Sequence, residues 1–101
     1  MSVIKISKDN FDSVVSGKKP VLIDFYADWC GPCRMVSPIV DEIANEREDI
    51  VVGKVNVDDS PELASAFKVY SIPTLVVLKG GKVVNQATGA RPKEAILSLL
   101  E

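Results

Sequence analysis

The hydrophobic pattern divides the chain into short apolar runs and longer stretches in which apolar residues recur at helical spacing. Short apolar runs bounded by turn residues are typical of strands, and the helical spacing is typical of amphipathic helices. Strands are predicted over residues 3–6, 21–27, 50–57, 74–79 and 82–88. Strands and helices therefore alternate along most of the chain.

Four helices are predicted from apolar stripes and start signals. The first covers residues 8–16 behind a capping Ser7, and the second covers 34–48. The third begins at Ser60-Pro61, and the last opens at Arg91-Pro92. The residues expected to face the core are, in chain order, Phe11, Val14, Val15, Met35, Val36, Ile39, Val40, Ile43, Ala44, Leu63, Ala66, Phe67, Tyr70, Ile96, Leu99 and Leu100.

The connections between these elements predict how the strands pair. Helices join the first three strands, which favours parallel pairing with right-handed crossovers. Gly80-Gly81 predicts a hairpin between the last two strands, and this adds an antiparallel pair. We therefore predict an α/β fold in a single domain over residues 1–101. It is a three-layer sandwich in which helices flank a five-stranded mixed sheet in the order βαβαβαββα.

The composition is that of an ordinary soluble globular protein, with 47% hydrophobic and 26% charged residues. The net charge of -2 and the lack of a basic stripe argue against a nucleic-acid ligand. Residues 1–5 lack the long apolar core of a signal peptide, and no apolar run approaches the ~20 residues that span a bilayer. We therefore expect a cytoplasmic protein that does not associate with membranes, in a compartment where structural disulfides are uncommon.

Both cysteines and the only tryptophan lie in one stretch, Trp29-Cys30-Gly31-Pro32-Cys33, between a predicted strand and a predicted helix. We expect Cys30 to lie exposed at the N-terminus of the helix, where unpaired backbone donors and the helix dipole favour a thiolate. Cys33 follows one turn later on the same side, shielded from solvent, at a separation that suits a disulfide. Pro32 is tolerated in the first helical turn.

Two other interpretations of the cysteine pair are possible. A C-x-x-C pair can be half of a four-ligand zinc site, but the chain has no further cysteine and no histidine. An inert structural disulfide is the other, but closing so short a loop removes little chain entropy. A redox-active pair is therefore the favoured interpretation.

Two charged residues interrupt otherwise apolar strands. Asp24 lies between Leu22-Ile23 and Phe25-Tyr26, so burial is expected to raise the pKa of its carboxyl. Lys54 interrupts the run from 51 to 57 in the same way, either paired with Asp24 or extending to solvent. A carboxyl of raised pKa near a thiol can accept and return the proton of the more buried cysteine.

Two turn regions carry no strong signal of their own. Ile72-Pro73-Thr74 precedes the fourth strand, where a proline is ordinary and its peptide bond is usually trans. Gly89-Ala90 ends the fifth strand and by itself predicts a turn.

Taken together, these motifs resemble the thioredoxin family over essentially the whole chain. The resemblance rests on the five-residue cysteine motif, and on Asp24 in the strand before it. Its further supports are Pro38, Lys54, Asn56-Val57-Asp58, Ile72-Pro73-Thr74 and Gly81 through Gly89. One residue departs from the pattern, because Tyr26 stands where many members have a second tryptophan. We do not expect this exchange to abolish activity.

The resemblance implies a role for each of these positions. Cys30 is expected to attack and Cys33 to resolve, with Asp24 as the buried acid that assists Cys33 and Lys54 as its neighbour. Asp58 is expected to accept a hydrogen bond from the Trp29 indole, and Pro73 to be cis and to lie against the disulfide. The residues implied to form an apolar docking surface for substrate proteins are Trp29, Gly31, Pro32, Ile72, Pro73, Gly89 and Ala90.

The function implied by the resemblance is that of a protein-disulfide reductase. Its Cys30/Cys33 dithiol reduces disulfide-containing substrate proteins and is then re-reduced by a thioredoxin reductase. No cofactor or metal is expected, because the two sulfurs hold the electrons, and a monomer is expected. An oxidase or isomerase module of the same fold is one alternative, although Pro32 between the cysteines favours reduction. A non-catalytic binding subunit is the other.

Overall fold

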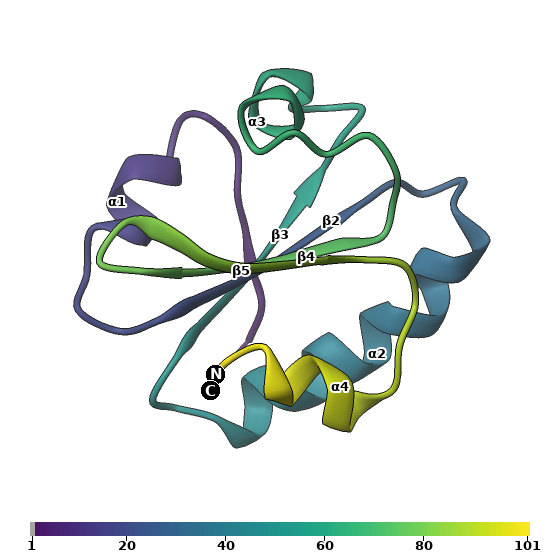
Figure 1. Ribbon diagram of the computed structural model, residues 1–101. Coiled ribbons are helices and arrows are strands. Elements are labelled where there is room, and N and C mark those ends of the chain that lie inside the picture. The colour runs from purple at the N-terminus through teal and green to yellow at the C-terminus, as the bar shows by residue number, and fades with distance from the viewer. Residues whose placement is uncertain (1) are drawn as a thin grey trace.

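Strands and helices alternate in the computed structural model, which describes residues 2–101, until the chain closes with a hairpin and a last helix (Figure 1). This confirms the predicted order βαβαβαββα. The elements are β1 (Ile4–Lys5), α1 (Phe11–Val15), β2 (Val21–Tyr26), α2 (Gly31–Glu46), β3 (Val51–Asn56), α3 (Pro61–Ala66), β4 (Thr74–Lys79), β5 (Lys82–Thr88) and α4 (Lys93–Ser98).

The sheet has the strand order β1-β3-β2-β4-β5. β3 pairs in parallel with both β1 and β2, because helical crossovers join these strands, and β4 runs antiparallel to β2 and β5. Gly80 and Gly81 adopt φ values of 61° and 78° in the β4–β5 turn, as a tight hairpin requires. The predicted five-stranded mixed sheet is therefore confirmed.

Helices cover both faces of the sheet, with α2 and α4 on one side and α1 and α3 on the other (Figure 1). β2 supplies side chains to both layers in alternation. Leu22 packs with α2 and α4, whereas Ile23 and Phe25 pack on the α1 and α3 side. Asp24, two positions after Leu22, therefore faces the α2 side, which is the side that carries the cysteine motif.

Side-chain contacts tie each pair of helices together. On one face, the Lys93 ammonium of α4 forms ion pairs with Glu42 and Glu46 of α2, at 2.6 and 2.7 Å. On the other face, the ring of Phe67 lies 5.6 Å from that of Phe11 and 5.6 Å from that of Phe25. Within residues 2–101, no helix is both long and apolar enough to cross a membrane.

α1 begins later than predicted. Ser7 does accept a hydrogen bond from the Asp9 amide, at 3.3 Å, but regular helix starts only at Phe11. The Asn10 side chain accepts from the Ser7 amide at 2.8 Å and donates to the Lys5 carbonyl at 2.9 Å. These two bonds hold residues 8–10 in turns, because the Asn10 side chain competes with the helical hydrogen bonds.

Three residues predicted to face the core are exposed: Ala66, Tyr70 and Met35. In α3 the buried positions are Leu63 and Ala64, so Ala66 lies on the outer side of the helix. Tyr70 lies beyond α3 and is 86% exposed, because the chain leaves the helix at Lys68, whose φ is 57°. There the Val69 amide donates to Ala64 and the Lys68 amide to Ser65, the pattern of a left-handed helix end. Met35 is 69% exposed, because the buried side of α2 follows Cys33, Val36, Val40 and Ile43.

Gly53 allows β1 to lie close to β3. A Cβ at Gly53 would overlap the buried Ile6 side chain, because Ile6 packs directly against the Gly53 backbone. Gly53→Ala should therefore lower the free energy of unfolding by about 1–3 kcal/mol, measured by chemical denaturation. Gly17→Ala is the matched control, because a Cβ there meets nothing within 4 Å. Equal denaturation midpoints for the two variants would contradict this packing argument.

Candidate active site

The two cysteines lie where β2 gives way to α2. Cys30 is the N-cap of α2, and Gly31 and Pro32 form its first turn, where the missing amide of proline costs no helical hydrogen bond. Cys33 follows inside the helix, and the two cysteines form a disulfide with their Cα atoms 5.3 Å apart. The two cysteines therefore lie at the N-terminus of the helix, as predicted.

The surroundings of Cys30 favour a negative charge on its sulfur. The Cys33 amide donates to the Cys30 Sγ at 3.2 Å, and the unpaired amides at the start of α2 point the same way. The carbonyl oxygen of Ile72, which lies 3.8 Å from Cys30 Sγ, opposes this effect because it carries a partial negative charge. After reduction, the Cys33 amide and the helix start lower the cost of forming a Cys30 thiolate.

Cys30 is more buried than the sequence suggested. It is only 4% exposed, and Cys33 is 2% exposed, so the expected contrast between an exposed and a shielded cysteine is wrong as stated. Ala27 and Ile72 pack around the pair and cover most of Cys30. The two cysteines differ instead in what they line. Cys30 lines a groove at the surface, and Cys33 lines a separate hollow.

The groove beside Cys30 has a volume of about 500 Å³ and is mostly apolar. It is bounded on one side by the cysteine motif and on the other by the segment that precedes β4. Its lining residues are Trp29, Cys30, Gly31, Pro32, Val57, Val69, Tyr70, Ser71 and Ile72. An extended polypeptide with a disulfide could reach the Cys30 sulfur along such a surface.

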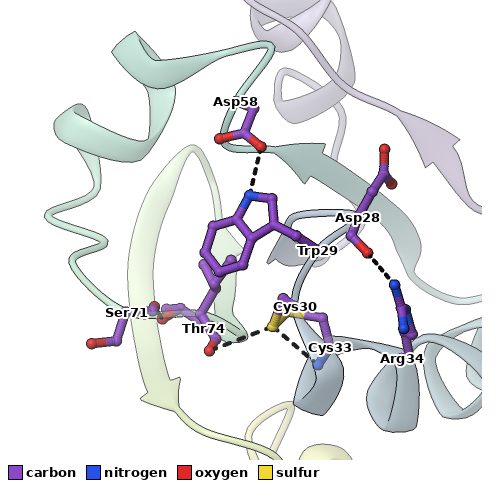
Figure 2. Close-up of a disulfide and its surroundings, with 9 residues drawn as sticks. Asp28, Trp29, Cys30, Cys33, Arg34, Asp58, Ser71 and Thr74 are labelled. Carbon is purple, nitrogen blue, oxygen red and sulfur yellow. Dashed lines mark hydrogen bonds between the residues drawn. A yellow bond between two sulfur atoms is a disulfide. The ribbon is translucent and has the colours of Figure 1, made fainter.

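The Trp29 side chain is fixed although 69% of it is exposed. Its indole Nε1 donates to Asp58 Oδ2 at 2.8 Å, which confirms the hydrogen bond that the resemblance implied (Figure 2). Asp58 is held in turn, because its amide donates to Asn56 Oδ1 at 2.9 Å. The indole therefore forms a fixed wall of the groove.

The peptide bond between Ile72 and Pro73 is cis, as the resemblance implied. The general frequency of cis peptide bonds before proline favours trans. Pro73 is buried, and the Gly89 amide donates to its carbonyl at 2.7 Å. This bond joins the turn after β5 to the segment before β4. Gly89 has a φ of 102°, in the left-handed region that glycine adopts readily.

The docking residues predicted from the sequence do not all line one surface. Trp29, Gly31, Pro32 and Ile72 line the groove, whereas Pro73, which is buried, and Gly89 do not. Ala90 lines a second hollow of about 350 Å³, between α2 and the turn after β5. The residues around that hollow are Met35, Val36, Ile39, Ala90, Arg91 and Pro92.

Asp24 is buried in the position that the sequence predicted, with 2% of its surface exposed. Burial raises the pKa of its carboxyl from 3.8 to about 7, against the opposing effect of the Lys54 charge. Its Oδ1 atom is buried and has no hydrogen-bond partner in the described chain. The carboxyl therefore exchanges a proton near neutral pH, the range in which a general base is useful.

Lys54 lies directly across from Asp24 in the parallel pairing of β2 and β3. Among the described residues no ion pair joins them, and the Lys54 ammonium lies 5.6 Å from the ring centre of Tyr26. Lys54 and Cys33 line the same hollow, of about 230 Å³. Tyr26, the residue that departs from the family pattern, thus contacts the Lys54 ammonium.

Four groove residues were missed from the sequence: Val57, Val69, Tyr70 and Ser71. The spacing of Tyr70 from Phe67 predicts a core position in α3, whereas its side chain lines the groove. Tyr70 and Ser71 directly precede Ile72-Pro73 in the sequence, and this closeness was the one feature that could have indicated a place in the groove. Among residues 2–101, no cluster of three or more histidine, cysteine or acidic side chains is arranged to hold a metal ion.

Comparison with known proteins agrees with this geometry. A family model described as Thioredoxin matches residues 2–101. A thioredoxin from Alicyclobacillus acidocaldarius is 46% identical over 96 residues, which cover 94% of this chain and 91% of that protein. One from Pyropia yezoensis is 49% identical and covers 99% and 95%. The bifunctional thioredoxin reductase/thioredoxin of Mycobacterium leprae is 50% identical over 88 residues, 86% of this chain and 19% of that protein.

Proposed function

Because this chain belongs to the thioredoxin family, we propose that its Cys30–Cys33 pair reduces disulfides in partner proteins that dock in the groove beside Trp29. Thiol–disulfide exchange is the reaction of the family, and the resemblance implies the separate roles of Cys30, Cys33 and Asp24. The observation that supports this proposal most strongly is the position of the Cys30 sulfur. It borders the groove and accepts a hydrogen bond from the Cys33 amide at the start of α2. No bound cofactor is needed, because the two sulfurs carry the electrons.

The first step is an attack by the Cys30 thiolate on one sulfur of the partner disulfide. A bond forms between Cys30 and that sulfur, and the other partner sulfur leaves as a thiolate. The amide of Cys33 and the start of α2 stabilise the attacking charge. Trp29, Pro32 and Ile72 hold the apolar side chains of the partner beside the reacting sulfurs.

The second step frees the partner. Cys33 loses its proton towards Asp24 and attacks the Cys30 sulfur, so that the Cys30–Cys33 disulfide forms and the second partner sulfur leaves. Asp24 suits this role because burial raises the pKa of its carboxyl to about 7. The hollow shared by Cys33 and Lys54 gives space for solvent beside Cys33 and beside the strand partner of Asp24.

The oxidised pair must then be reduced again. We propose a thioredoxin reductase as the electron donor, and the fusion of both activities in the Mycobacterium leprae relative supports this choice. A monomer in the cytosol fits the scheme, because the groove must stay open to many partners and the compartment must keep dithiols reduced.

A reduction assay on insulin, with dithiothreitol as electron donor, tests the proposal. The protein should speed reduction of the insulin disulfides well above dithiothreitol alone, and its reduction potential should be more negative than that of glutathione. A potential much more oxidising than glutathione would favour the oxidase or isomerase function. A double cysteine-to-serine variant that keeps full biological function would favour a binding subunit.

A further inference from the structure

Arg91 holds two consecutive carbonyl groups of the turn after β5. Its Nη2 donates to the Thr88 oxygen at 2.9 Å, and its Nε donates to the Gly89 oxygen at 3.4 Å. Thr88 is the last residue of β5, and Gly89 has the left-handed φ of 102°. One guanidinium group therefore closes this turn from its outer side.

The same turn is tied to the segment that carries the cis proline. The Gly89 amide donates to the Pro73 carbonyl at 2.7 Å, and the hydroxyls of Thr88 and Thr74 lie 3.2 Å apart. Thr74 also donates to the Ser71 carbonyl at 2.6 Å, and Figure 2 shows both residues beside the disulfide. A continuous set of polar contacts thus runs from Arg91 to the edge of the groove.

We propose that Arg91 is a positioning residue, which holds residues 88–91 against Pro73 and thereby keeps the groove wall at Ser71 in the shape that receives an extended polypeptide substrate. The inference rests on the proposed function, because it assumes that substrates dock in the groove beside Trp29. Gly89 has no side chain to limit its backbone, so the conformation of the turn depends on these hydrogen bonds. Without the guanidinium the turn must be ordered at each docking event, and this lowers affinity for a polypeptide.

The hydrogen bonds of Arg91 distinguish a positioning role from an electrostatic attraction of acidic substrates. Both contacts of its guanidinium go to carbonyls of its own turn, and they use the planar fork that only arginine offers. A lysine would keep the positive charge but could not reproduce both bonds. Arg91→Lys should therefore behave like Arg91→Leu if Arg91 holds the turn, and like the wild type if only its charge matters.

The experiment compares wild type, Arg91→Lys and Arg91→Leu. With insulin as substrate, both variants should show a KM raised about threefold to tenfold with kcat nearly unchanged. With a small aromatic disulfide, which has no polypeptide chain to dock, the rate constant should stay within about twofold. The Gly89 amide, which donates to the Pro73 carbonyl, should exchange with solvent faster in both variants. A general loss of stability would instead speed exchange throughout the protein.

Arg47→Leu is the matched control for the loss of one positive charge, because Arg47 pairs with Asp49 at the far end of α2. It should leave KM and the Gly89 exchange rate unchanged. A wild-type KM for Arg91→Lys, or unchanged exchange at Gly89 in both variants, would overturn the proposal. If the wild-type protein itself does not reduce insulin, the proposed function fails, and the exchange measurement still decides whether Arg91 holds the turn.

Discussion

Replacing Cys30 with serine should lower the rate of insulin reduction by at least about a thousandfold, because the attacking group is then lost outright. A serine hydroxyl at the start of α2 remains protonated at neutral pH and does not form a stable bond to sulfur. The measurement is turnover with dithiothreitol as donor, on protein whose folding has been checked by circular dichroism.

Cys33→Ser should give a different result from Cys30→Ser. Cys30 can still attack, but nothing inside the protein resolves the product, so a mixed disulfide between Cys30 and the substrate should accumulate. Mass spectrometry of the trapped complex measures this directly. Full activity in both serine variants, or trapping by Cys30→Ser in place of Cys33→Ser, would contradict the assigned order of attack.

Asp24→Asn should make the oxidised protein more stable at pH 8 by on the order of 4 kcal/mol. The pKa of Asp24 is raised from 3.8 to about 7 in the folded protein, so between these values the unfolded chain has released a proton that the folded chain retains. Stability therefore falls as pH rises through this window, and the full loss is present above pH 7. Asparagine has no such charge to bury.

The sign of this effect can be tested by chemical denaturation at several pH values. The difference between Asp24→Asn and wild type should shrink below about 1 kcal/mol near pH 4, where both states of the wild type hold the proton more nearly equally. Asp12→Asn, which removes an exposed carboxylate on α1, is the matched control and should show no comparable gain. A constant difference between pH 4 and pH 8 would show that Asp24 acts through packing alone.

The same substitution should slow the chemistry while it stabilises the fold. Without a carboxyl to accept the Cys33 proton, resolution of the mixed disulfide at neutral pH should slow by about tenfold to a hundredfold. Stopped-flow measurement of mixed-disulfide decay gives this rate separately from the attack by Cys30. A gain in stability with no kinetic change would make Asp24 a structural acid only.

The sheet and its helices could be predicted from the sequence because each strand and helix has a strong local pattern. The continuous apolar run of β2 indicated burial on both faces, and Gly80-Gly81 indicated the hairpin. The helix ends could not be predicted as well. α1 begins late because of the side-chain hydrogen bonds of Asn10, and α3 ends at the left-handed backbone of Lys68. The spacing of apolar residues reveals neither feature.

The candidate site divides in the same way. The cysteine motif and Asp24 stand out because a thiol pair at a helix start and a carboxyl inside an apolar strand are unusual locally. The groove wall at Tyr70 and the hollow that Met35 lines depend on segments that meet only in the folded chain. The Arg91 contacts are local, but no pattern of apolar and polar residues indicates them. Burial of Cys30 under Ile72 likewise comes from a residue 42 positions away in the sequence.

Trp29 gives the molecule an optical probe of its own. It is the only tryptophan, because Tyr26 occupies the position where many relatives have another, so the emission of the protein comes from a single indole. That indole is held by Asp58 and borders the same groove as the Cys30 sulfur. Its fluorescence should therefore change both when the disulfide is reduced and when a polypeptide fills the groove, which permits label-free titration of redox state and docking.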